Sequence, residues 1–264
     1  MTELAAHTLA RSRAVVMAEL RRLLPGIEDL PTALPFGLAA LDSHLPQGGL
    51  ACGGLHEVVP EQGATPAAFG FMAAILARLG GAEPLVFVVP RYELRELGRL
   101  YGHGLNVFGL DPARLILVET THRKDTLWAL EEALHSGAPA AVTGVIDQLE
   151  LKLSQRLQLA ATAAGLPLLL LRPARNLESS AAATRWRVGT AKAARDRFGL
   201  FARSRWHLQL ERCRNGRPGE WMVEYDHVAH RFSLAAALAD PALSHRAGEK
   251  SFEKSFEKSL RQAG

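Results

Sequence analysis

Cysteine is nearly absent from this sequence, which holds only Cys52 and Cys213 in 264 residues. A disulfide framework needs more pairs, and neither cysteine stands at metal-ligand spacing from histidines or another cysteine. Long apolar runs are also missing, because none approaches the roughly 20 residues that cross a bilayer. The first residues mix acids and arginines with apolar side chains, unlike a secretory signal peptide. We therefore expect a reduced, cytoplasmic protein that needs no membrane and no metal.

Signatures of hydrolytic catalysis are missing too. The serines lie in no nucleophile elbow, and the ten histidines form no metal-binding pattern on an expected helix. With 48% hydrophobic and 22% charged residues, the chain suits one globular core with short extensions. The net charge of +4 favours a polyanionic partner.

Short apolar runs alternate with amphipathic stretches through the middle of the chain. Strands are expected at 56–59, 84–89, 115–119, 140–146 and 167–173, and helices at 66–79, 92–101, 125–135 and 147–164. This order is typical of an α/β protein with a mostly parallel, twisted sheet and helices on both faces. Strict alternation at 205–213 and 221–226, around a turn, predicts an antiparallel β-hairpin extension at the sheet edge.

Three regions follow from this pattern. Residues 1–32 hold an amphipathic helix at about 3–24 and a linker, residues 33–240 form the core, and residues 241–264 form a flexible tail.

Two segments at the ends of these elements resemble those of a known protein family. The stretch FGLAALDSHLPQGGLACGGLHEVVPEQG resembles the segment of the RecA family that leads into the first core strand and the phosphate loop. The later stretch TLWALEEALHSGAPAAVTGVIDQL resembles that family's helix–Ser-Gly-Ala–strand passage. Over about residues 33–215, the resemblance implies a RecA-like core with a nucleotide site after its first strand.

The phosphate loop itself is degenerate. An active loop needs glycines, a lysine for the β- and γ-phosphates, and a hydroxyl for Mg²⁺. Here the loop reads Gly63, Ala64, Thr65, Pro66, with Thr65 near the lysine position. By the resemblance, the Mg²⁺-organising aspartate falls on Val145, and the nearest match to the catalytic glutamate is Leu94. We expect a relic loop, no cofactor and no ATP hydrolysis. The alternative is an ATPase that borrows a lysine, for instance Lys152 or one from a neighbouring subunit.

More closely, the chain is similar to the ImuA family of RecA-like proteins from bacterial damage-induced mutagenesis cassettes. The residues that carry this similarity are GGLHEV, RWHLQLERCRNGRPGEWMVEYD and the missing lysine. It implies an accessory factor of the SOS response, acting in translesion synthesis beside an ImuB-like Y-family polymerase homologue, with RecA as a further partner. Homo-oligomers are a further expectation by resemblance. The related SulA division inhibitors share the degenerate core, so a protein that binds a tubulin-like division protein is the alternative.

A basic segment follows the last expected parallel strand. Ten lysines and arginines lie between Thr184 and Arg217, opposed in sequence only by Asp196 and Glu211. The resemblance makes residues 174–203 a mobile loop that meets single-stranded DNA, where arginines would neutralise phosphates and aromatic rings would stack on bases. The expected contacts are Arg185, Trp186, Arg187, Lys192, Arg195, Arg197 and Arg203. Two alternatives for this segment are a solvated loop and a surface that binds an acidic protein.

The tail repeats a four-residue unit. Phe252, Phe256 and Leu260 recur at i, i+4 and i+8, which on a helix makes one narrow apolar stripe. Such a stripe suits docking into a groove of a partner protein. A disordered repeat is the alternative.

Overall fold

A nine-stranded sheet organises the protein. The computed structural model describes residues 33–173, 179–193 and 203–235. The strands are β1 (Ala33–Leu34), β2 (Leu50–Ala51), β3 (Leu55–Pro60), β4 (Leu85–Pro90), β5 (Leu115–Thr120), β6 (Ala141–Val145), β7 (Leu168–Leu171), β8 (Thr184–Thr190), β9 (Ser204–Cys213), β10 (Gly219–Asp226) and β11 (Arg231–Leu234). The helices are α2 (Ala39–Asp42), α3 (Thr65–Leu76), α4 (Arg91–Leu97), α5 (Gly102–Val107), α6 (Arg123–Ser136) and α7 (Leu151–Ala164), with 3-10 turns η1 (Pro46–Gly48) and η2 (Pro112–Arg114).

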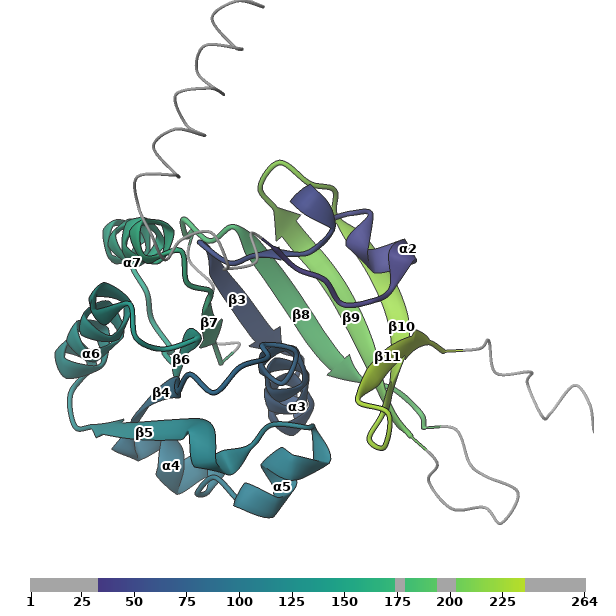
Figure 1. Ribbon diagram of the computed structural model, residues 1–264, viewed down its shortest axis with the longest axis horizontal. Helices are drawn as coiled ribbons and strands as arrows, with labels where there is room; N and C mark the ends of the chain where they lie inside the picture. The colour runs from purple at the N-terminus through teal and green to yellow at the C-terminus, as the bar shows by residue number, and fades with distance from the viewer. Residues whose placement is uncertain (1–32, 174–178, 194–202, 236–264) are drawn as a thin grey trace, which may run out of the picture.

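The strand order is β11-β10-β9-β8-β3-β7-β6-β4-β5, and β1 pairs with β2 in a separate small sheet. Strands β8, β3, β7, β6, β4 and β5 run parallel to one another, whereas β9, β10 and β11 continue the sheet in antiparallel fashion. Figure 1 shows the two halves, which meet where β8 pairs with β9. The predicted α/β class, with a mostly parallel sheet and an antiparallel hairpin extension, is confirmed.

The apolar core lies in two layers, one on each face of the sheet. Helix α3 is apolar around most of its circumference and is buried on one face, against Trp186 and Phe232 among others. Helices α6 and α7 cover the parallel half on the other face. A Cβ at Gly70 of α3 would stand 2.8 Å from the ring of Phe108, so only glycine allows this close approach.

Two elements differ from the sequence prediction in their bounds. The helix expected at 92–101 is broken, because Gly98 adopts φ 83° and separates α4 from α5. The helix expected from residue 147 begins at Leu151, after a segment in which the Asp147 carboxylate accepts a hydrogen bond from the Gln148 N–H. Among the described residues, none of the helices combines the length and apolar character needed to cross a bilayer.

One expected loop contains a strand of the sheet. Residues 174–203 were expected to be a DNA-binding loop, but Thr184–Thr190 forms β8, between β3 and β9 in the middle of the sheet. Its sequence TRWRVGT alternates, with Thr184, Trp186 and Val188 buried against the α3 layer and the arginines on the opposite face. The sequence pattern did not predict this strand, because its second face carries arginines. It therefore lacks the continuous apolar run by which its parallel neighbours were recognised.

The motif GGLHEV places two polar side chains in the interior on opposite faces of β3. His56 lies wholly buried, with Nδ1 2.8 Å from the Thr184 hydroxyl and Nε2 2.8 Å from the Ala51 carbonyl. The carbonyl can only accept, so Nε2 donates and Nδ1 accepts from Thr184. Burial lowers the pKa of His56 to about 4, against a weaker opposing effect of the Ala51 carbonyl. The ring is therefore neutral and structural.

Glu57 links β3 to the strands on both of its sides. Its carboxylate, fully buried, accepts a hydrogen bond from Nη1 of Arg172 at 2.6 Å and from Nε of Arg185 at 2.7 Å. Arg172 follows β7 and is also fully buried, while Arg185 belongs to β8. A buried carboxylate between two guanidinium groups holds both neighbours of β3 in register.

Removing the Glu57 charge should destabilise the fold strongly. In Glu57→Gln, Arg172 and Arg185 would share no carboxylate, and we expect a loss of about 3–5 kcal/mol in the free energy of unfolding. Glu211→Gln is the matched control, because Glu211 pairs with Arg187 at the surface and should cost at most about 1 kcal/mol. Urea unfolding measures both; equal losses would contradict the role given to Glu57.

His56 should make stability depend on pH. The unfolded side chain binds a proton near pH 6.5, whereas the folded one does so only near pH 4. Its contribution is therefore complete above pH 6.5 and is lost as the pH falls toward 4, by about 2 kcal/mol at pH 5. The stability difference between the native sequence and His56→Gln, measured by urea unfolding, should shrink by that amount from pH 7.5 to pH 5. A difference independent of pH would contradict the buried neutral ring.

Candidate functional site

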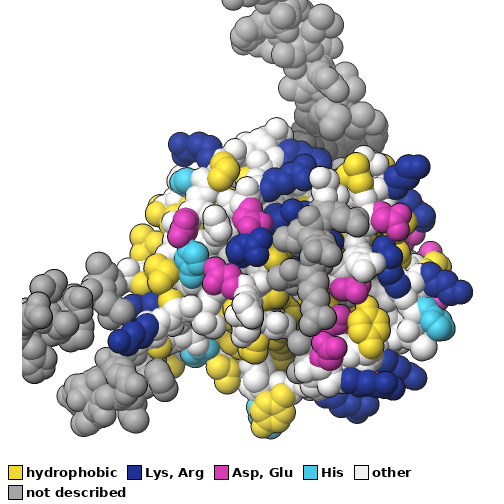
Figure 2. All heavy atoms as spheres, turned by 180° about the vertical axis from the view of Figure 1, so that it is seen from behind, with side chains coloured by type: hydrophobic (Ala, Val, Ile, Leu, Met, Phe, Trp, Pro, Cys, Tyr) yellow, Lys and Arg dark blue, Asp and Glu magenta, His cyan; other side chains and the backbone are white. Residues whose placement is uncertain are grey.

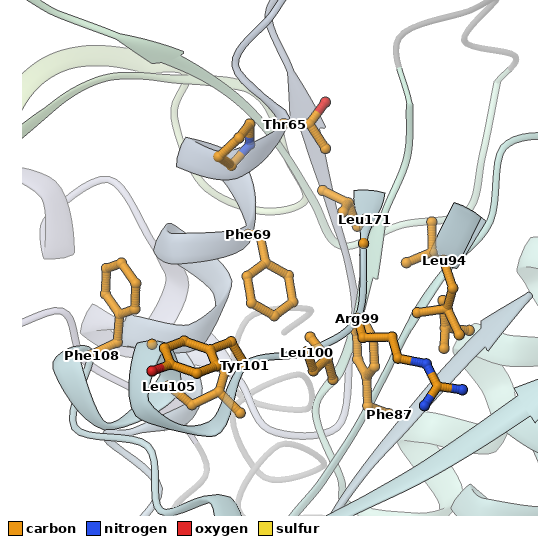
Figure 3. A pocket seen from close by; sticks show the side chains of 15 residues that line it. Thr65, Phe69, Phe87, Leu94, Arg99, Leu100, Tyr101, Leu105, Phe108 and Leu171 are labelled. Atoms are coloured by element: carbon orange, nitrogen blue, oxygen red, sulfur yellow. The ribbon is translucent and has the colours of Figure 1, made fainter. Parts of the chain in front are cut away.

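A pocket of about 250 Å³ opens at the carboxyl ends of the parallel strands (Figure 3). The ends of β4, β6 and β7 supply Val89, Val145 and Leu171. The first turns of α3 contribute Thr65, Pro66 and Phe69, and the remaining wall comes from Phe87 and the α4–α5 region. Ligands of open α/β sheets bind outside the carboxyl ends of the strands, so the position is that of a binding site.

The structure brings together the three positions that the RecA resemblance assigns to nucleotide chemistry. Thr65, Leu94 and Val145, expected at the places of the lysine, the catalytic glutamate and the Mg²⁺-organising aspartate, all line this pocket. None of the three carries a charge, and two are aliphatic. A triphosphate with its metal needs opposite charges and acidic ligands around it, and these three positions supply neither.

The loop before α3 is a tight turn. Gly63 adopts φ 74°, the N–H of Ala64 donates to the Glu61 carbonyl at 2.9 Å, and Pro66 has no N–H. Two amide groups that a phosphate cradle would use are therefore occupied or absent. The one charged side chain from Glu61 to Pro66 is the Glu61 carboxylate, which lies 2.9 Å from Nδ1 of His207.

Nearby acidic residues do not fill the missing roles. Glu93 is buried and lies outside the pocket lining. Asp147 follows the end of β6 and interacts with Tyr92; burial, followed by the charge of Asp147, raises the pKa of that phenol to about 12. No group of three or more metal-ligating side chains occurs in the described part of the chain.

The predicted DNA contacts on β8 are placed differently from the expectation. Trp186 is fully buried, packs against Phe36 and Phe71, and donates its indole N–H to the Thr184 hydroxyl, so its face is not available to a base. Arg185 is bound to Glu57, and Arg187 pairs with Glu211. The prediction that these three side chains stand on an exposed loop is wrong.

The counter-charges come from strands that are distant in sequence. Arg205 pairs with Glu224 across β9 and β10, and Arg203 lies 2.9 Å from Asp226. Arg212 and Arg214 donate to the carbonyls of Ser180 and Ala181. The surface seen from behind in Figure 2 accordingly shows basic and acidic side chains interspersed over much of the face. A count of the acidic residues between positions 184 and 217 does not include these partners, because strands that pair in a sheet can be far apart in the sequence.

The other predicted contacts lie at or beyond the limits of the described residues. Lys192 is exposed just after β8, and Arg203 is half-exposed just before β9. Arg195 and Arg197, and the tail residues Phe252, Phe256 and Leu260, lie outside the described residues. Both cysteines are unpaired, and burial raises the pKa of each thiol, which disfavours a nucleophilic role.

The pocket wall itself was not foreseen from the sequence. Three of its aromatic rings come from three different parts of the chain and belong to Phe69, Tyr101 and Phe108. Arg99 also lines the pocket, and its side chain is 85% exposed. Individually these residues look like ordinary core or surface positions. The sequence did contain one signal for this site, which is that Thr65, Leu94 and Val145 all lack a charge.

Comparison with characterised sequences gives the chain its family. No established family profile matches it. Protein ImuA of Caulobacter vibrioides, in strain NA1000 / CB15N and in strain ATCC 19089 / CIP 103742 / CB 15, is 37% identical over 229 residues. The match covers 78% of this chain and 90% of the relative. The chain belongs to the ImuA family.

Proposed function

We propose that this protein is a non-catalytic, RecA-like accessory factor of damage-induced, error-prone translesion DNA synthesis. One observation carries the non-catalytic part: the pocket that joins Thr65, Leu94 and Val145 has an uncharged side chain at each position where nucleotide hydrolysis needs a charged one. The pathway follows from membership of the ImuA family. That membership also favours mutagenesis over the division-inhibitor alternative.

The proposed partners are an ImuB-like Y-family polymerase homologue and RecA. In such an assembly, the protein would act by binding rather than by turnover. The charged face of β8, β9 and β10 is a rigid surface, since its arginines are held by Glu57, Glu211 and Glu224. Fixed side chains suit specific recognition, because little rotamer entropy is lost when a partner binds.

Contact with single-stranded DNA remains part of the proposal, in a narrower form. Most of the ten basic residues between Thr184 and Arg217 have internal carboxylate or carbonyl partners. Among the described residues, Lys192 has no such partner; Arg195 and Arg197, which lie outside the described residues, follow it in the connection between β8 and β9. We propose this junction as the DNA contact.

Nucleotide should not stabilise the protein. A ligand at one hundred times its dissociation constant adds about 2.7 kcal/mol to the free energy of unfolding. We expect 2 mM Mg-ATP to leave the thermal unfolding midpoint unchanged, because Thr65 and Val145 supply neither the charge nor the metal ligand that a bound Mg-triphosphate needs at those positions. A RecA protein with an intact phosphate loop serves as the positive control. A rise in the midpoint of several degrees would contradict the proposal.

Charge reversal at the β8–β9 junction should weaken DNA binding and its salt dependence. For Arg195→Glu with Arg197→Glu, loss of two phosphate contacts should reduce the slope of log K against log salt by about 1.4. The matched control is Lys152→Glu with Arg156→Glu on α7, which makes the same change in net charge on a different element. Fluorescence anisotropy of a labelled single-stranded oligonucleotide measures both. An unchanged slope in the first variant, or an equal change in both, would place the contact elsewhere.

A further inference from the structure

The pocket at the strand ends has a mostly apolar lining that includes one arginine, Arg99. Phe69, Phe87 and Phe108 form much of its wall, and Thr65 supplies one of the few polar groups. Its volume, about 250 Å³, falls below the roughly 300–1,000 Å³ of small-molecule sites, so it suits one or two side chains. Figure 3 shows Phe69 directed toward the space between α3 and the loop that carries Leu100 and Tyr101.

One of the residues that line the pocket, Arg99, carries a positive charge. Its guanidinium lies 3.9 Å from the carboxylate of Glu119, which is also 3.5 Å from Arg91, so two guanidinium groups share one acid. The Arg99 side chain is largely exposed, and so is Tyr101, another residue of the lining. An acidic group that follows an apolar anchor would therefore meet a cation at the mouth.

The C-terminal tail of the same chain carries this combination. In SFEKSFEKSL, Phe252 is followed by Glu253 and Phe256 by Glu257. We propose that the tail docks intramolecularly on this pocket, with the ring of Phe256 inserted between Phe69 and Phe108 and the carboxylate of Glu257 at Arg99. A phenylalanine ring packs favourably, edge to face, against the aromatic wall.

The tail is long enough to reach the pocket. The described chain ends at Ala235, whose N–H donates to the Met222 carbonyl of β10. Position 256 lies 21 residues beyond position 235 (256 − 235), a span of up to about 70 Å when extended. A domain of this size is roughly 40 Å across. The pocket also adjoins the same strands, since Tyr225 of β10 donates to the Phe108 carbonyl at 2.8 Å.

A weak contact is sufficient in this geometry. A short flexible linker presents its end at an effective concentration of order millimolar. An anchor with a dissociation constant of tens of micromolar would then occupy the pocket most of the time. A partner with a similar anchor would have to compete with the tail, so the tail would regulate access to the site. The inference concerns this pocket alone, and its failure would leave the proposed DNA contact untouched.

Disulfide trapping in the full chain tests the docking. Cys213→Ser removes the partly exposed native thiol, and Cys52 is buried. In that background, Ser255→Cys is combined with Tyr101→Cys at the rim, or with Ala163→Cys in the α6–α7 groove as the matched control. We expect the disulfide to position 101 to form at least tenfold faster than that to position 163, and within one chain on non-reducing gels.

Two further variants separate docking from chance encounter. Phe252→Ala with Phe256→Ala should slow the 255–101 disulfide at least tenfold, because the anchors are lost. Arg99→Glu, at an exposed position, should slow it at least threefold, and adding Glu257→Arg should restore the rate. Equal rates to positions 101 and 163, no effect of the phenylalanine changes, or a disulfide formed mainly between two chains would each overturn the intramolecular docking.

Discussion

The structure depends on the carboxylate of Glu57. It lies buried within the parallel part of the sheet, on the strand between β7 and β8, and it binds one arginine from each of these two neighbours of β3. An unpaired charge buried in that position would strongly destabilise the fold, so Glu57, Arg172 and Arg185 are needed together. Two other nitrogens of Arg172 have no hydrogen-bond partner among the described residues, so the shared carboxylate is what holds that guanidinium in the interior.

This arrangement determines what the basic segment can do. Arg185 is paired with Glu57 in the interior. The next arginines on the same face, Arg187 and Arg205, form ion pairs with carboxylates of β9 and β10. His207 continues the row between Glu61 and Glu220. The face is therefore an ordered pattern of alternating charge instead of a positive groove. A polyanion gains little on such a surface, because each phosphate would have to displace an existing acidic partner.

The pocket combines the position of a ligand site in an open α/β sheet with a mostly apolar lining. The sheet directs the ends of β4, β6 and β7 toward the N-terminus of α3. Because most of the side chains there are aliphatic or aromatic, the concavity favours apolar contact.

The sequence by itself determined the parallel strands other than β8, the helices between them and the hairpin, since continuous apolar runs, 3.6-residue periodicity and strict alternation each report local geometry. It also determined that Thr65, Leu94 and Val145 are uncharged, and the similarity to the ImuA family was already visible in it. Only the tertiary structure decided that these three residues line one pocket, that TRWRVGT is a central strand, and that the arginines have partners. The reason is physical: ion pairing and pocket formation depend on strands that are far apart in the sequence, as for Glu57 and Arg185, which are 128 positions apart, and no local pattern encodes that distance.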